Sequence, residues 1–281
     1  MKRLIQFLAV ATSSFLFSAE GSAAAFTFTT PTQPLPGVPG NGLTGQLWTN
    51  VDPTTDTLAQ AQAIIDGGYA TANFLSTTVD YPAGPDGATS TSATYASVFD
   101  ATALSTLDNA SVLPDDVLNT VMRFAGFFGV FGANEVWTFH IPSDDGSAVD
   151  IQGTRVLNND GIHGFGGPST TVEFTNPGLY ALDVLFFESQ ASQWGIEFRG
   201  GLDGAVPTTD ISSRLYSLRG FAEPGDDRLD SIQPGTPMPE PGTLVLLASA
   251  GLFALVGRRP RCSGRRESCA DNDQLERTTV A

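Results

Sequence analysis

The central part of this chain of 281 residues lacks cysteine and lysine. Both cysteines, Cys262 and Cys269, lie close to the C-terminus. Residues 26–239 therefore contain no disulfide and no thiolate, which excludes cysteine nucleophiles and Cys-ligated zinc there. A domain of this size can bury enough apolar surface to be stable without cross-links.

Positive charge and histidine are also scarce. Residues 26–239 carry 24 acidic residues and six arginines, which gives a formal net charge of −18. Such a surface repels phosphate backbones, so we expect no nucleic-acid partner. The acidity suits calcium sites, but it equally serves to keep a surface without lysine soluble. With His140 and His163 as the two histidines, no zinc-binding cluster and no Ser-His-Asp arrangement stands out.

Residues 1–25 have the pattern of a secretory signal peptide. A basic pair precedes the apolar run Leu4 to Phe17, and small residues follow in an A-x-A arrangement at Ala23 and Ala25. The apolar run is short for a bilayer span, so a permanent N-terminal anchor is the weaker alternative. We therefore expect an exported protein.

A second export feature occupies residues 238–261. It consists of Pro239-Glu240-Pro241, the 14 residues of the apolar segment 243–256 and a cluster of arginines. As a helix, this segment would span about 21 Å, less than the hydrocarbon core of roughly 30 Å. The order of features resembles the PEP-CTERM sorting signal. That resemblance implies recognition by a membrane sorting protease (exosortase), transient inner-membrane attachment through residues 243–256, and secretion or display on a Gram-negative cell surface.

Proline, glycine and polar residues divide the rest of the chain. Residues 26–41 are rich in Thr, Pro and Gly, which predicts a linker, and residues 205–237 predict a stalk or loosely packed domain end. The domain between them, residues 42–204, contains a Ser-, Thr- and Ala-rich stretch that predicts a long surface insertion near residues 85–115. The polar tail 262–281 departs from the PEP-CTERM pattern and leaves open whether the apolar segment is cleaved.

Short strand-like stretches separated by turn residues dominate residues 42–204. The strand pattern is clearest in residues 178–187, where apolar and other residues alternate with the period of a strand that buries one face. The sequence therefore predicts an all-β fold, an antiparallel β-sandwich with one or two short helices. One helix is expected at residues 57–66 with Asp56 as its N-cap, and a second is expected to start at Pro114.

The most informative pattern is an aromatic strand that runs into Ser143-Asp144-Asp145-Gly146. A second strand leaves this motif for the Asn159-Asp160-Gly161 hairpin, and a Gly-Leu-Tyr strand later ends in Phe187-Glu188. Residues 42–48 look like an opening strand. Together these features resemble the protective-antigen (PA14) domain family, whose members include yeast flocculins and bacterial glycosidase modules. The resemblance implies a lectin-like sandwich over residues 42–204.

Asp144 and Asp145 are the candidate metal ligands. Adjacent side chains at the end of a strand normally point to different sides, so both can share one cation only with an unusual backbone. A cis peptide, which costs about 3 to 4 kcal/mol, is such a backbone. In lectins of the resembled family a cis Asp-Asp pair binds Ca²⁺, whose six to eight oxygen ligands leave room for two sugar hydroxyls. The alternative is a plain Asp-Gly turn without an ion.

Four further residues complete the predicted ligand-binding set. The resembled lectins add an Asn or Asp from a later loop, but the loop aligned there has neither, so the carbonyl of Gln190 or Gln193 is the expected substitute. Asn159, Asp160 and Trp194 are the other candidates. Turn chemistry is the alternative role for the first two, and core packing is the alternative for the tryptophan.

From these features we expect an exported surface or matrix protein with a carbohydrate-binding domain and no enzymatic activity. Its partners would be extracellular glycans or exopolysaccharide, with Ca²⁺ as the candidate cofactor. The alternative, from a different functional class, is a structural extracellular-matrix protein that binds no ligand. A glycan hydrolase is a weaker one, because nothing marks two carboxylates as a catalytic pair.

Overall fold

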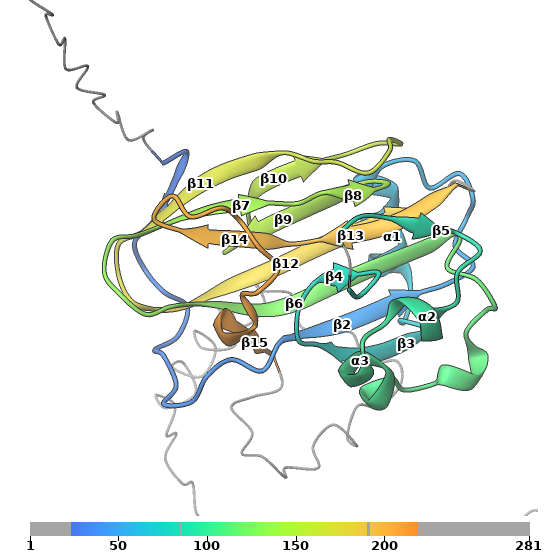
Figure 1. The fold of residues 1–281 in the computed structure, drawn as a ribbon, viewed down its shortest axis with the longest axis horizontal. Helices are drawn as coiled ribbons and strands as arrows, with labels where there is room; N and C mark the ends of the chain where they lie inside the picture. The colour runs from blue at the N-terminus through green and yellow to red at the C-terminus, as the bar shows by residue number, and fades with distance from the viewer. Residues whose placement is uncertain (1–23, 85, 190–191, 219–281) are drawn as a thin grey trace, which may run out of the picture. The chain divides into compact units, whose positions relative to one another are not determined.

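The computed structural model describes residues 24–84, 86–189 and 192–218, which form a β-sandwich with a few short helices (Figure 1). The predicted fold class is thus confirmed. Most of the predicted signal peptide, the whole sorting signal and the polar tail lie outside the described residues. Within the described part, no helix is long and apolar enough to cross a membrane.

The larger layer is a seven-stranded sheet. Its strands are β2 (Leu43–Trp48), β3 (Ala72–Ser76), β6 (Thr120–Val130), β9 (Ser147–Ile151), β10 (Thr154–Asn159), β12 (Gly178–Glu188) and β15 (Leu215–Ser217). They are ordered β10-β9-β12-β6-β2-β3, and β15 also pairs with β6. Because β15 is part of this sheet, residues 205–218 are the end of the domain, which agrees with the second of the two predicted roles, and they are not a stalk.

Two smaller sheets complete the sandwich. The first has the order β1-β11-β7-β14, and the second joins β4, β5 and β8 to β13. The strands are β1 (Phe26–Phe28), β4 (Asp80–Tyr81), β5 (Thr89–Ser90), β7 (Glu135–His140), β8 (Ser143–Asp144), β11 (Ser169–Phe174), β13 (Gln193–Glu197) and β14 (Arg199–Leu202). β1 pairs in parallel with β11, so the predicted linker 26–41 begins as a strand.

The core lies between the layers and is rich in aromatic rings. Phe128 of β6 is fully buried, and its ring centroid lies 5.0 Å from that of Trp137, 5.1 Å from that of Phe139 and 5.7 Å from that of Phe174. Edge-to-face and offset aromatic pairs of this kind add to the hydrophobic gain from burial. These rings join the seven-stranded sheet to the sheet that contains β7 and β11.

The strand β12 confirms the predicted alternation and adds to it. Its even-numbered residues from 180 to 186 face the core. Leu185 and Phe187 point the other way, yet they are buried as well, because the helix α1 (Leu58–Gly67) covers this part of the outer face. A small second core forms there from Trp48, Leu58, Ala61, Val121, Ala148, Leu185 and Phe187.

The helix α1 matches the predicted helix, but its cap differs. Thr57 is the N-cap, and its side chain accepts a hydrogen bond from the amide of Gln60, so the prediction of Asp56 as the cap is wrong. The amide of Leu58 donates to Asp160 Oδ1 at 2.7 Å. Two side chains thus satisfy backbone donors that the first turn of a helix leaves unpaired.

Replacing Thr57 with alanine should lower the free energy of unfolding by about 1 kcal/mol, because a capping hydrogen bond is lost. Urea unfolding of the Thr57→Ala variant measures the change. Thr208, which is exposed, gives the matched control, and Thr208→Ala should be neutral. Equal stability of both variants would mean that Thr57 does not cap α1.

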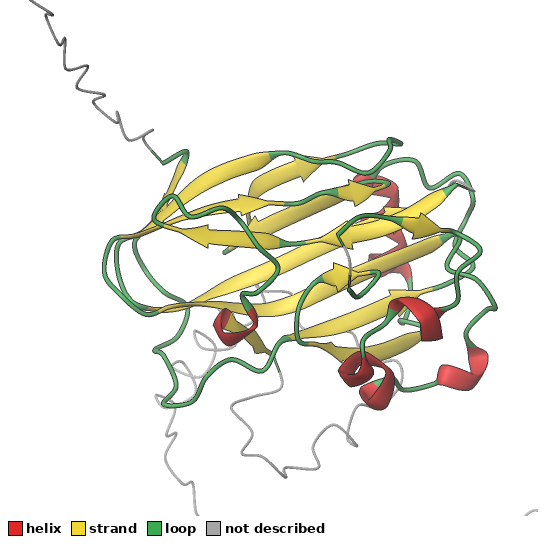
Figure 2. Cartoon of the chain, in the orientation of Figure 1, coloured by secondary structure: helices red, strands yellow, loops and turns green. Residues whose placement is uncertain are grey.

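The predicted surface insertion near residues 85–115 is mostly exposed or half-buried, as expected for a surface segment, but it also contributes side chains to the core. It contains the short helices α2 (Tyr95–Val98) and α3 (Ala101–Thr106) and the 3-10 turn η1 (Ala110–Val112). Its buried apolar side chains are Tyr95, Val98, Phe99 and Ala103. No helix starts at Pro114 in the described chain, so that prediction is wrong, and the remaining 3-10 turn is η2 (Ser212–Arg214). In Figure 1 and in Figure 2, α2 and α3 lie beside the strands, whereas α1 lies behind them.

Candidate metal centre

Three carboxylates meet at one end of the seven-stranded sheet. Asp144, Asp145 and Glu188 each offer one oxygen, and these oxygens lie within 4.8 Å of one another. The residues are 3%, 2% and 0% exposed, respectively. Buried carboxylates are costly unless hydrogen bonds, protons or a cation compensate their charge. The arrangement has the size and the ligand type of a site for a hard cation.

Strand pairing brings the three residues together. Asp144 ends β8, which pairs with β13, and the chain then turns through Asp145 and Gly146 into β9. The amide of Phe187 donates to the carbonyl of Gly146 at 2.9 Å, which fixes this turn beside the end of β12 and so beside Glu188. A Cβ at Gly146 would lie 2.2 Å from the Phe187 ring, so only glycine fits. The Asp144–Asp145 peptide bond is cis, as the family resemblance implied.

Backbone amides orient the carboxylate of Asp145. Its Oδ1 accepts a hydrogen bond from the amide of His163 at 3.2 Å, and its Oδ2 accepts one from the amide of Ser189 at 3.3 Å. These contacts join the turn after β8 to the loops that follow β10 and β12. The carboxylate is therefore held in place by two segments that are distant from it in sequence.

The electrostatic environment disfavours a second negative charge next to Asp145. Burial, together with the charge of Asp145, raises the pKa of Asp144 to about 6, although His163 and the backbone amide of Phe165 act in the opposite direction. A bound cation would reverse this balance, because it stabilises the charged form of every carboxylate around it.

Glu188 is the member of this cluster that the sequence analysis did not select. Glu188 could have been found from the alternation of β12, in which residues 180, 182, 184 and 186 are core positions. Continuing the period by one step places residue 188 on the inward side, and there the sequence has a glutamate instead of an apolar residue. A carboxylate at an inward strand position calls for a compensating partner.

The other predicted ligand-binding residues have different surroundings. Asn159 Nδ2 donates to Ser143 Oγ at 3.0 Å and to the carbonyl of Gly166 at 2.8 Å, so it supports the loops beside the cluster. Asp160 accepts bonds from the amides of Leu58 and Gly161. Both sets of contacts match the alternative role in loop structure, and ligand binding by either residue stays a prediction.

The remaining two candidates are Trp194 and Gln190. Trp194 is 0% exposed, and its ring packs at 5.8 Å against the ring of Phe186 in an edge-to-face arrangement. The prediction that it stacks on a sugar is wrong, because no ring face is exposed, and core packing is confirmed. Gln190 lies outside the described residues. Gln193 begins β13 and is exposed, so its carbonyl remains a predicted ligand.

The comparisons with known proteins concern the fold. No family model and no curated protein matches the chain. Among solved structures it is similar to the PA14 sugar-binding domain from an RTX adhesin, with a TM-score of 0.52, 18% identity, and coverage of 63% of this chain and 99% of that one. It is also similar to the PA14 domain of the antifreeze protein MpAFP, with a TM-score of 0.51, 19% identity, and coverage of 67% and 97%. The domain therefore has the PA14-type fold that its sequence resembled.

Proposed function

We propose that this chain is an exported, calcium-dependent carbohydrate-binding protein whose site is formed by Asp144, Asp145 and Glu188. The observation that carries the proposal is the meeting of three buried carboxylates within 4.8 Å. Calcium prefers carboxylate and carbonyl oxygens, and it takes more ligands than this cluster supplies. The remaining coordination positions suit two neighbouring hydroxyl groups of a sugar ring.

The fold supports the choice of ligand class. One of the similar structures is that of a PA14 sugar-binding domain. A fold alone does not define a function, so the argument depends on the cluster. In this proposal the protein binds glycan without cleaving it.

A glycan array with and without a chelator tests the proposal. The full chain should bind a subset of glycans in the presence of Ca²⁺, and EDTA should abolish that binding. Chelator-resistant binding of the same glycans would contradict the role of the cation. Absence of both glycan and calcium binding would favour the structural matrix protein, and release of sugars from the array would favour a hydrolase.

Calcium affinity should fall as the pH drops through about 6. The raised pKa of Asp144 means that the folded, metal-free protein binds this proton more tightly than an unfolded chain does. Ca²⁺ must displace the proton below that pH, so the affinity should decrease by up to about tenfold per pH unit. Calcium titrations at pH 5, 6 and 7 measure the trend, and a constant affinity across this range would contradict it.

The two ends of the chain support export and sorting in the same proposal. If residues 1–25 are a signal peptide and Pro239-Glu240-Pro241 is a sorting motif, the mature protein should begin near residue 26 and end near the motif. Mass spectrometry of protein isolated from the cell surface or medium of the producing cells measures both ends. A mature chain that keeps residues 262–281 would contradict processing by a sorting protease.

A further inference from the structure

The turn that carries both aspartates of the candidate metal centre is closed at its base by two buried hydroxyl groups. Ser143 precedes Asp144 and Asp145, and Ser147 follows the turn. The Oγ atoms of the two serines lie 2.7 Å apart, and both residues are 0% exposed. A hydrogen bond between buried hydroxyls satisfies polar groups that would otherwise destabilise the fold. Because the serines flank the turn, their bond fixes the distance between its two ends.

The side-chain amide of Asn159 connects this pair to the neighbouring loop. Asn159 lies opposite Ser147 in the pairing of β10 with β9. Its Nδ2 donates to Ser143 Oγ at 3.0 Å and to the carbonyl of Gly166 at 2.8 Å. A carbonyl can only accept, so the nitrogen and not the oxygen of the amide faces Gly166. We call Ser143, Ser147 and Asn159 the polar clasp.

The polar clasp supports the surroundings of both aspartates. Asp144 directly follows a member of the clasp in β8. The bond from the clasp to Gly166 closes the loop 160–165 at its base, and the backbone amide of His163 in this loop donates to Asp145 Oδ1 at 3.2 Å. One set of hydrogen bonds therefore positions the turn and a loop that orients a carboxylate, although the clasp contains no carboxylate itself.

We propose that Asn159 is a positioning residue of the calcium site: through the polar clasp its amide holds Asp144 and Asp145 in the geometry that binds the cation, and it does not coordinate the cation. This inference rests on the proposed function. Loss of a group that supports metal ligands from outside the coordination sphere typically lowers metal affinity by about 10- to 100-fold. The two donors of the side chain matter in this role, whereas coordination would depend on its oxygen.

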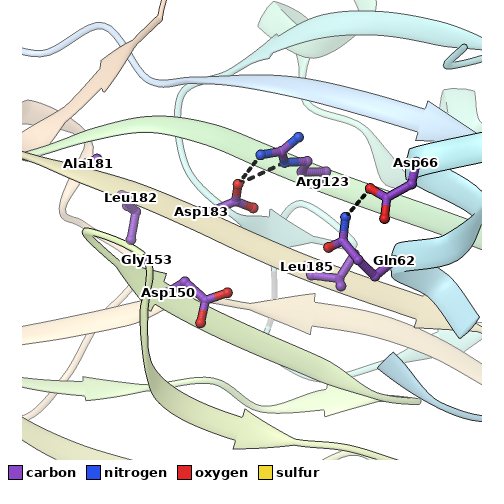
Figure 3. Close-up of a pocket in the computed structure, with 9 residues that line it drawn as sticks. All are labelled: Gln62, Asp66, Arg123, Asp150, Gly153, Ala181, Leu182, Asp183 and Leu185. Atoms are coloured by element: carbon purple, nitrogen blue, oxygen red, sulfur yellow. Dashed lines mark hydrogen bonds and ion pairs between the residues drawn. The ribbon is translucent and has the colours of Figure 1, made fainter. Parts of the chain in front are cut away.

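The pocket beside α1, on the outer face of the seven-stranded sheet, also contains three carboxylates, but each of them accepts hydrogen bonds from a neighbouring side chain. The pairs, of which Figure 3 shows the first two, are Arg123–Asp183, Gln62–Asp66 and Arg155–Asp150. Carboxylates that are paired in this way compete poorly for a cation. We therefore expect a calcium titration to report on the cluster of Asp144, Asp145 and Glu188.

The Asn159→Asp variant of the full chain separates positioning from coordination, because it keeps the shape and the oxygen of the side chain but removes both donors. Calorimetric titration with Ca²⁺ at pH 7 should give an affinity at least about tenfold lower than that of the parent protein. Coordination predicts the opposite result, because an additional carboxylate ligand raises the affinity of a calcium site. An affinity equal to or higher than that of the parent would overturn the proposal.

Asn176→Asp is the matched control. Asn176 Nδ2 also donates to a carbonyl and a hydroxyl, those of Thr29 and Thr175, but it lies next to the start of β12, whereas Glu188 ends this strand. This variant should bind Ca²⁺ as the parent does. Ser147→Ala removes one hydroxyl of the clasp and little volume, so it tests the proposal even if Asn159→Asp does not fold. It should bind Ca²⁺ severalfold more weakly, and an unchanged affinity would overturn the proposal.

Hydrogen exchange in EDTA tests the polar clasp without a cation. The backbone amides of Ser143 and Gly166 each donate to the other residue's carbonyl, and these amides and that of His163 should exchange faster in Asn159→Asp than in the parent. Equal exchange rates would overturn the proposal. A parent protein that binds no Ca²⁺ would contradict the proposed function, whereas a parent that binds it and a variant that binds equally well would contradict the role of Asn159 alone.

Discussion

The Asp144→Asn variant should lose calcium binding and calcium-dependent glycan binding, with an affinity for Ca²⁺ lower by about 100-fold or more. The substitution keeps the shape of the side chain but removes one of three carboxylate charges, and the number of charged ligands largely sets the affinity of calcium sites. Calorimetric titration with Ca²⁺ and binding to an array glycan measure the two losses.

The metal-free form of the same variant should be at least as stable as the metal-free parent protein at pH 7. The raised pKa of Asp144 shows that its charged form is disfavoured in the folded protein, so the neutral amide removes an unfavourable interaction. Thermal unfolding in EDTA checks this, and Asp115→Asn at an exposed position is the matched control. A variant that binds Ca²⁺ as tightly as the parent would place the cation elsewhere.

Replacing Phe128 with alanine should lower the free energy of unfolding by about 3 to 5 kcal/mol, the cost of a large cavity in a packed core. Phe128 lies on the seven-stranded sheet, is fully buried and contacts rings of the opposite layer, so its loss weakens the packing between the two layers. Urea unfolding of Phe128→Ala measures the change. Val206 is 82% exposed, and Val206→Ala should change stability by less than about 0.5 kcal/mol. Similar losses in both variants would contradict the assigned core.

The parts of the fold that could be predicted from the sequence are those with a strong local period. The alternation in residues 178–187 correctly identified β12 and its core-facing side, because every second residue of a strand points the same way. The contribution of residues near 85–115 to the core was missed because their polar Ser and Thr dominate the composition. Their few apolar residues, such as Tyr95 and Phe99, are buried in the core, where Phe99 contacts the rings of Phe74 and Tyr81.

The candidate site could likewise be predicted only in part from the sequence. The Asp144-Asp145 motif is contiguous and could be recognised, and the structure places both carboxylates in one buried cluster. Glu188 joins them only through the register of β12 beside the turn at Gly146, which is a tertiary relation. Trp194 was assigned to the ligand site because an indole ring suits stacking on a sugar. Its burial depends on neighbours such as Phe186, which no local sequence pattern reveals.

Calorimetric titration of the EDTA-treated protein with Ca²⁺ tests the claim that Asp144, Asp145 and Glu188 form a calcium site. We predict one ion per chain, together with a rise in melting temperature of about 5 to 10 °C when the ion is present at 100 times its dissociation constant. No heat of binding and no thermal shift at millimolar Ca²⁺ would contradict the claim.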